Sequence, residues 1–140
     1  LFGGVWIGDT FFLRCTTFLN QYVSIAVRLP LAVVFLLAAG YLAWTGLFIM
    51  FGEPMEESRV VKKDVYGLVR HPIYLGEILV YLGFLLLSIS LAAAAVWLGA
   101  IALLHYISRY EEKLLLERFG ETYQEYMREV PMWMPRPWKR

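Results

Sequence analysis

The sequence has 140 residues, enough for one domain at most, and 59% of them are hydrophobic, with a mean hydropathy of +0.56. This composition excludes an ordinary soluble domain of this size, and an aromatic content of 16% suits a protein at a membrane interface. The net charge of +1 gives no global field that would attract nucleic acid, and a single cysteine, Cys15, excludes an intramolecular disulfide and a cysteine-based metal site.

Residues 1–28 are apolar but are interrupted by Asp9, Arg14, Asn20 and Gln21. A charge at the centre of a bilayer costs roughly 2.5–3.5 kcal/mol on insertion scales. The segment is therefore either a first membrane span, with its charges near its ends or paired, or a helix that lies in the interface. We favour the span.

Residues 29–51 contain no charge, and 23 apolar and small residues are enough to cross a bilayer core of about 30 Å. Pro30 falls in the first turn, where proline is tolerated. Gly40 and Gly46 are small enough to let another helix approach closely. This stretch is predicted to be a membrane helix.

Residues 52–71 form a polar connector of mixed charge. Its last two residues begin the stretch Arg70-His71-Pro72-Ile73-Tyr74. Proline suits the first position of a helix and pushes the preceding residue out of the α region, so a helix is predicted to begin at Pro72. Arg70 and His71 then flank the free N–H groups of the first turn and create a candidate anion site at the membrane surface. The plainer interpretation is a helix start with an interfacial arginine anchor.

Residues 78–104 form a second uncharged run of 27 residues, which is either one span or a hairpin that turns near Ser88-Ile89-Ser90. Length favours one span, and no glycine or proline marks the turn. The positive-inside rule favours a hairpin across 72–108, because a hairpin places the basic residues on both sides of the run on one membrane face. Those basic residues are Lys62, Lys63, Arg70, Arg109, Lys113 and Arg118. We therefore predict an all-α, polytopic fold with about four membrane helices, including this hairpin.

Residues 109–140 carry one apolar stripe at helical spacing on an otherwise charged surface, as in an amphipathic cytosolic helix. The stripe consists of Leu115, Phe119, Tyr123, Tyr126 and Val130. Thr122 and Glu125 form a candidate capping box after Gly120, so one helix is expected to stop near Gly120 and another to begin near Tyr123. The final residues 133–140 suit an aromatic and basic tail at the headgroup level.

A hairpin would bring Arg70 and His71 beside Arg109, Glu111 and Glu112, which gives a pocket for a zwitterion. Taken alone, the two glutamates are only a solvated helix face. A metal site built from His71 and His105 lacks any spacing signal, so no metal is predicted. Glu77, an ionisable group inside a membrane arm, is a functional candidate by default or else pairs with Arg109.

Two blocks of residues resemble the isoprenylcysteine carboxyl methyltransferase and phospholipid N-methyltransferase superfamily. Residues 66–77, YGLVRHPIYLGE, are similar to its Arg-His-Pro-x-Tyr motif. Residues 109–131 resemble its C-terminal signature, with paired glutamates, Phe-Gly, spaced tyrosines and a closing Val-Pro. The resemblance covers roughly residues 60–135. Members often have Gly-Pro where this chain has Asp64-Val65, which leaves the shape of the connector open.

The resemblance implies an integral membrane methyltransferase that uses S-adenosylmethionine in a pocket open to the cytosol, within one membrane-embedded domain over 1–140. A lipophilic substrate, an isoprenylcysteine-like carboxylate or a phospholipid amine, would enter from the bilayer. The positions that match the cofactor motifs are Tyr66, Arg70, His71, Pro72, Tyr74, Glu111 and Glu112. Arg109 lies close to a family arginine that faces the reaction centre, where it would orient a carboxylate acceptor. For an amine acceptor, Glu77, Glu111 or Glu112 would accept the proton, and the sequence does not distinguish the two kinds of acceptor.

The same resemblance leaves an alternative open. Membrane sterol and steroid reductases, which use NADPH, share a His-Pro-x-Tyr and a Gly-Glu like Gly76-Glu77. A membrane scaffold protein without catalytic activity is the remaining alternative. The paired glutamates favour the methyltransferase.

Overall fold

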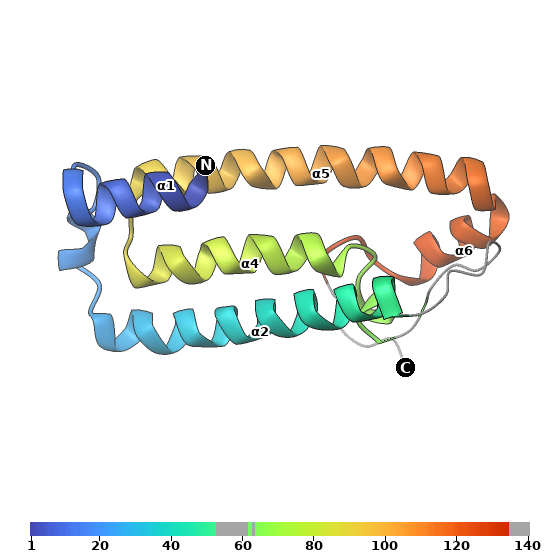
Figure 1. Cartoon of the computed structure of the whole chain (residues 1–140), viewed down its shortest axis with the longest axis horizontal. Coiled ribbons are helices and arrows are strands. Elements are labelled where there is room, and N and C mark those ends of the chain that lie inside the picture. The colour runs from blue at the N-terminus through green and yellow to red at the C-terminus, as the bar shows by residue number, and fades with distance from the viewer. Residues whose placement is uncertain (53–61, 63, 135–140) are drawn as a thin grey trace.

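The computed structural model describes residues 1–52, 62 and 64–134, and every regular element in these ranges is helical. The helices are α1 Phe2–Ile7, α2 Ile25–Gly52, α3 Val65–Leu68, α4 Pro72–Leu87, α5 Leu91–Phe119 and α6 Glu121–Glu129. A π-helical stretch, Gly8–Leu13, and a 3-10 turn, Phe18–Gln21, lie between α1 and α2. Helices α2, α4 and α5 run lengthwise beside one another, with α4 in the middle (Figure 1). This confirms the all-α prediction.

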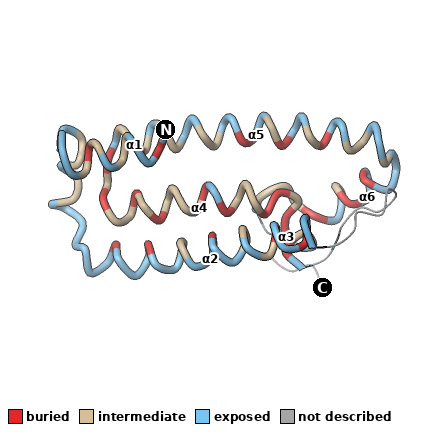
Figure 2. The backbone as a smooth tube through the Cα atoms, viewed as in Figure 1, coloured by how far each residue is buried: buried red, intermediate tan, exposed pale blue. Residues whose placement is uncertain are grey.

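Two of these helices are long and apolar enough to cross a membrane. Helix α2 has 28 residues with a mean hydropathy of 2.1, and α5 has 29 residues with 1.8. Both helices expose many large apolar residues, and Figure 2 shows much of their length coloured as exposed. Helix α4, with 16 residues, is about 24 Å long and falls short of a full crossing.

The expected span over residues 1–28 does not form. The helical segments there, α1 and Gly8–Leu13, have six residues each, whereas a span needs about 20. Arg14, with φ of 51°, closes the helical stretch in the left-handed region. The polar residues that interrupt this segment are instead held inside the bundle, as described below.

The hairpin between α4 and α5 is confirmed, and it turns at Ser88–Ser90. Ser90 is extended, and its Oγ accepts a hydrogen bond of 3.1 Å from the Ala93 N–H, so the side chain caps α5. The turn needs no glycine because this cap supplies the local bond that starts the second helix. One continuous helix over 78–104 is excluded.

Helices α2 and α4 pack closely because small residues lie between them. A Cβ atom on Gly83 would lie 2.7 Å from the Leu36 side chain, and one on Gly46 would lie 2.9 Å from the Ile73 side chain. At Gly76 the added atom would lie 3.2 Å from the Ala39 carbonyl oxygen. The predicted close approach is thus confirmed at Gly46. At Gly40, for which it was also predicted, no atom lies within 4 Å.

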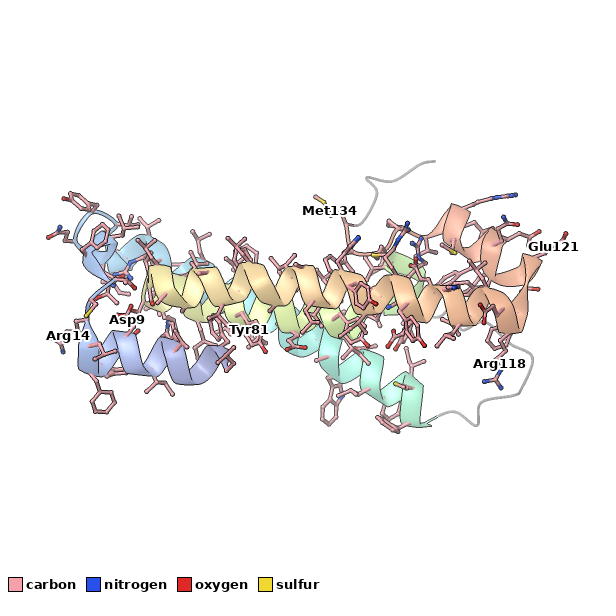
Figure 3. All side chains as sticks on the ribbon, turned by 90° about the horizontal axis from the view of Figure 1, so that it is seen from above. Asp9, Arg14, Tyr81, Arg118, Glu121 and Met134 are labelled. Atoms are coloured by element: carbon pink, nitrogen blue, oxygen red, sulfur yellow. The ribbon has the colours of Figure 1, made fainter. Side chains whose placement is uncertain are left out.

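Polar side chains fasten the N-terminal segment to the α4–α5 turn, at the end of the bundle far from α6 (Figure 3). We call this group the polar clasp; its members are Asp9, Thr16, Asn20, Arg28, Ser88 and Ser90. Asp9, only 4% exposed, accepts hydrogen bonds from Ser90 Oγ at 2.6 Å, from the Thr16 N–H at 3.1 Å and from Thr16 Oγ1.

Arg28 forms the second half of the polar clasp. Its Nη1 donates to Asn20 Oδ1 at 2.5 Å and to the Leu87 carbonyl at 3.0 Å, and its Nε donates to the Val23 carbonyl at 2.9 Å. Asn20 Oδ1 also accepts the Ile89 N–H at 2.8 Å. A buried charge must find hydrogen-bond partners, and the clasp provides them from turns and helix ends.

At the opposite end, α5 stops at Gly120, whose φ of +55° favours glycine, and α6 folds back against α5. The predicted apolar stripe makes this contact, because Tyr123, Tyr126 and Val130 are buried against Leu115 and Phe119. The predicted capping box was wrong. Gly120 is the N-cap of α6 and no side chain caps the helix, because the helix begins one residue before Thr122.

Candidate functional site

The Arg70–Tyr74 stretch begins α4 as predicted. His71 is the N-cap and Pro72 is the first helical residue. The backbone N–H of Arg70 donates to the Pro131 carbonyl at 2.9 Å, and that of His71 donates to the Met132 carbonyl at 3.3 Å. The segment that follows α6 therefore runs back along the start of α4.

Arg70 pairs with one carboxylate and two main-chain carbonyls of the protein itself. Its Nε lies 2.7 Å from Glu112 Oε1, and its Nη1 donates to the Met127 carbonyl at 3.0 Å and to the Val130 carbonyl at 2.5 Å. The exposed fractions of the Arg70 and Glu112 side chains are 8% and 3%. The candidate anion site at this helix start thus holds the carboxylate of Glu112.

His71 and Tyr74 extend the cluster to Glu111. His71 Nε2 lies 3.3 Å from Glu112 Oε1, and His71 Nδ1 lies 3.6 Å from Glu111 Oε2. The Tyr74 ring stacks on the His71 ring, and the Tyr74 hydroxyl donates to Glu111 Oε1 at 2.5 Å. We call these five residues the ion-pair cluster; they are Arg70, His71, Tyr74, Glu111 and Glu112. The two sequence motifs therefore meet, and the paired glutamates are no solvated helix face.

Three buried polar atoms have no hydrogen-bond partner among the described residues, one in the ion-pair cluster and two outside it. Glu112 Oε2 and Ser108 Oγ, four residues apart on α5, are both buried and accept or donate no hydrogen bond there. The indole N–H of Trp133 is also buried and has no hydrogen-bond partner among these residues. A buried polar atom left unpaired costs about 1–3 kcal/mol. Atoms of this kind fit a polar ligand that brings its own donors and acceptors.

Three tyrosines surround the cluster outside the membrane helices. Burial raises the pKa of Tyr123 to about 12, and burial also raises the pKa of Tyr126. Burial, followed by the negative charge of Glu111, raises the pKa of Tyr66. The Tyr126 hydroxyl donates to the Tyr66 carbonyl at 2.6 Å. These phenols stay neutral and act as hydrogen-bond donors at physiological pH.

The two predicted catalytic residues lie apart from each other. Glu77 is exposed on α4 and accepts a hydrogen bond of 2.5 Å from the Tyr81 hydroxyl. Arg109 is exposed on α5 and has no ion pair or hydrogen bond within the described part of the chain, so the suggested Glu77–Arg109 pair does not form. The predicted common face of His105, Arg109 and Glu112 is split, because Glu112 is buried while His105 packs edge-on against Trp133 at 5.5 Å.

The sequence did not reveal how the segment after α6 contributes. Its carbonyls receive Arg70 and His71, and its Trp133 helps to line an apolar cavity of about 370 Å³. The cavity is lined by Leu42, Leu68, Val69, Leu75, Leu79, Trp133 and Met134. Ser108 was also missed, although its spacing of four from Glu112 was a usable signal. Within the described residues, no group of three or more histidine, cysteine or acidic side chains could hold a metal ion.

Comparison with known families decides which chemistry these motifs belong to. The model of the phospholipid methyltransferase family matches residues 21–122, most of the chain. The chain belongs to this family. Family membership and the two long apolar helices together make it an integral membrane protein.

Two bacterial methyltransferases are among the curated proteins that this chain resembles. Methanethiol S-methyltransferase of Mycobacterium tuberculosis is 29% identical over 132 residues, which cover 94% of this chain and 47% of the relative. Methanethiol S-methyltransferase 2 of Bradyrhizobium diazoefficiens is 38% identical over 79 residues, which cover 54% of this chain and 29% of the relative.

A third relative carries a different kind of name. The cobalt-zinc-cadmium resistance protein CzcN of Cupriavidus metallidurans is 34% identical over 94 residues, which cover 66% of this chain and 42% of the relative. The chain spans less than half the length of each of these relatives. No solved structure matches the chain.

Proposed function

We propose that this chain carries the catalytic centre of an integral membrane methyltransferase that uses S-adenosylmethionine. The observation that carries the proposal is the ion-pair cluster, in which Arg70 and His71 bind one oxygen of the Glu112 carboxylate, while the other has no partner in the described part of the chain. Membership in the phospholipid methyltransferase family and the names of two relatives support the same reaction class.

The cluster suits a ligand that has both a cationic and an anionic end. Glu111 and Glu112 would face the cationic groups and hydroxyls of S-adenosylmethionine, while His71 and the phenol of Tyr66 would donate hydrogen bonds. Tyr74, whose hydroxyl donates to Glu111, would hold that carboxylate in place. Pro72 fixes the helix start, and Arg70 acts by holding Glu112 in place. The bound cofactor supplies a methyl group already activated by its sulfonium.

The chain's own work is then to align the acceptor with that methyl group and to exclude water. We propose that the acceptor is lipophilic and arrives from the bilayer, because the helices that flank the cluster present apolar surfaces. The family name suggests a phospholipid amine, the two relatives are named for methanethiol, and the superfamily resemblance also includes a carboxylate. Arg109 would serve only a carboxylate that reached the exposed side of α5.

We also propose that the site faces the cytosol. Figure 3 shows Arg118 at the end of the bundle where α5 meets α6, Lys113 precedes it by five residues on α5, and Arg70 binds the Met127 and Val130 carbonyls at the end of α6. Basic residues favour the cytosolic side. In this arrangement α2 and α5 would cross the bilayer, with the shorter α4 packed beside them. Cysteine labelling at Lys62 and Glu121 would report equal accessibility from the cytosol. Opposite accessibility would contradict the orientation.

The cofactor is tested with the protein purified in detergent. S-Adenosylhomocysteine at about 100 times its dissociation constant should stabilise the folded protein by near 2.7 kcal/mol, and NADPH should not. Labelled S-adenosylmethionine should then transfer its methyl group to components of a total lipid extract or to an added alkanethiol. Stabilisation by NADPH alone would support the reductase alternative, which no observation in the structure favours.

A further inference from the structure

Glu77 is the one charged residue of α4, and neither the ion-pair cluster nor the polar clasp uses it. Its side chain is exposed, and its Oε1 accepts the Tyr81 hydroxyl at 2.5 Å. Tyr81 is itself fixed, because its ring stacks on the Phe2 ring of α1 with the centroids 4.4 Å apart; Figure 3 shows Tyr81 near α1. The chain thus holds a carboxylate on an apolar helix with one neutral donor and no cation.

The carboxylates of Glu77, Glu111 and Glu112 differ in the hydrogen-bond and ion-pair partners that they have. Glu112 is buried against Arg70 and His71, and a carboxylate paired in this way holds its charge. Glu111 accepts the Tyr74 hydroxyl and also faces His71. Glu77 alone has no basic partner within the described part of the chain, so it is the carboxylate that can take up a proton without breaking an ion pair.

Glu77 also lies next to the proposed cofactor pocket. It follows Tyr74 by three residues, about 4.5 Å along the axis of α4. Residues three apart share a face of a helix, so Glu77 lies on the same side of α4 as Tyr74, whose hydroxyl donates to Glu111. Polar groups therefore lead from the ion-pair cluster along α4 towards the middle of the bundle.

We infer that Glu77 is the proton acceptor in methyl transfer, that Tyr81 is its positioning residue, and that the methyl acceptor is a neutral thiol or amine. The inference rests on the proposed function. A lone pair on the acceptor sulfur or nitrogen forms the new bond to the methyl carbon of the sulfonium donor. The donor's sulfur–methyl bond breaks with its electron pair left on that sulfur, and the S–H or N–H proton passes to the Glu77 carboxylate.

A carboxylate acceptor does not fit this arrangement. It carries no proton to lose at neutral pH, and Glu77 and Glu111 would repel it while α4 offers no cation to orient it. A thiol or amine brings the proton that Glu77 can take, and its neutral form can reach Glu77 through the bilayer. The inference therefore selects between the acceptor classes that the family leaves open.

Methyl transfer to a long-chain alkanethiol, an aryl thiol, a long-chain amine and a fatty carboxylate tests the inference, with Glu77→Gln, Tyr81→Phe and the control Glu125→Gln. Glu125 is an exposed carboxylate on α6. We expect Glu77→Gln to lower kcat for the alkanethiol or the amine by about 10²–10⁴-fold, the range of general base catalysis. An aryl thiol, which is largely ionised at pH 8, should lose less than about tenfold. Tyr81→Phe should show the same selective pattern with a smaller loss.

Calorimetric titration with S-adenosylhomocysteine provides a readout that does not depend on turnover. All three variants should keep the wild-type affinity, because Glu77 acts on the acceptor. Equal losses with alkyl and aryl thiols, unchanged turnover in Glu77→Gln, or preferred methylation of the carboxylate would each overturn the inference. Failure of the wild-type protein to bind S-adenosylhomocysteine would instead overturn the proposed function.

Discussion

Both ends of the helical bundle bury charged side chains, but they satisfy them differently. In the polar clasp, both oxygens of Asp9 accept hydrogen bonds, and the Arg28 guanidinium donates to three oxygens of the chain. In the ion-pair cluster, Glu112 Oε2 has no partner among the described residues, and neither does Ser108 Oγ, four residues away on α5. A buried charge is therefore no mark of a ligand site by itself. The atoms left unpaired are what separate a binding site from a structural fastening.

Replacing Arg70 should have the largest effect. Arg70→Gln leaves the Glu112 charge buried without its main partner and removes the bonds to the Met127 and Val130 carbonyls. Breaking a buried pair on one side costs roughly 3–5 kcal/mol. We expect α6 to detach and S-adenosylhomocysteine binding to be lost, as seen by proteolysis and calorimetry. The control Lys113→Gln, at an exposed position of α5, should change neither.

Replacing Glu112 tests the unpaired oxygen more finely. Glu112→Gln keeps the side-chain volume but removes the charge, and a charge-assisted hydrogen bond contributes roughly 1.5–3 kcal/mol. We expect S-adenosylhomocysteine to bind about ten- to a hundredfold more weakly in a titration, together with lower thermal stability. Glu117→Gln, on an exposed face of the same helix, is the matched control. Wild-type affinity in Glu112→Gln would mean that the free oxygen meets no cofactor.

A substitution in the polar clasp should lower the stability of the protein but leave cofactor binding unchanged. Asp9→Asn weakens the bonds from Thr16 and Ser90 and should lower the free energy of unfolding by roughly 1.5–3 kcal/mol. The affinity for S-adenosylhomocysteine should stay within about twofold, because the clasp lies at the far end of the bundle (Figure 3). Arg14→Gln, exposed at the same end, serves as control. Loss of binding in Asp9→Asn would remove the distinction between the two ends.

The smallest effect is expected at Tyr126, which supports the ion-pair cluster without touching it. Tyr126→Phe removes the hydrogen bond to the Tyr66 carbonyl, worth about 0.5–1.5 kcal/mol. Thermal unfolding should shift slightly, and cofactor binding should weaken by less than about tenfold. Tyr110→Phe, at an exposed position, should have no effect. A larger loss of binding would place Tyr66 in direct contact with the cofactor.

The sequence predicted those parts of the fold that depend on local rules and on charge. Pro72 fixed the start of α4, the distribution of basic residues indicated the hairpin, and the apolar stripe placed Tyr123 and Tyr126 in the core. The meeting of Arg70 with Glu112 followed from the hairpin once it was assumed. These predictions needed no knowledge of distant backbone atoms.

The errors came from interactions that the sequence pattern does not encode. Asp9 and Arg14 suggested the ends of a span, but Asp9 is satisfied by Ser90, which lies 81 residues away. Arg70 was expected to stay available for a ligand, yet it donates to the main-chain carbonyls of Met127 and Val130 at the end of α6. Carbonyl groups are present at every residue, so no side-chain motif shows which of them a guanidinium will reach.

The return of the chain to the start of α4 sets the order in which the protein can become functional during its synthesis. The N–H groups of Arg70 and His71 bind the Pro131 and Met132 carbonyls, so the ion-pair cluster is complete only when those residues are in place. Helices α2, α4 and α5 all precede these residues in the chain. A chain cut short between Gly120 and Pro131 would therefore keep all three helices but lack the carbonyls that hold the start of α4 in place.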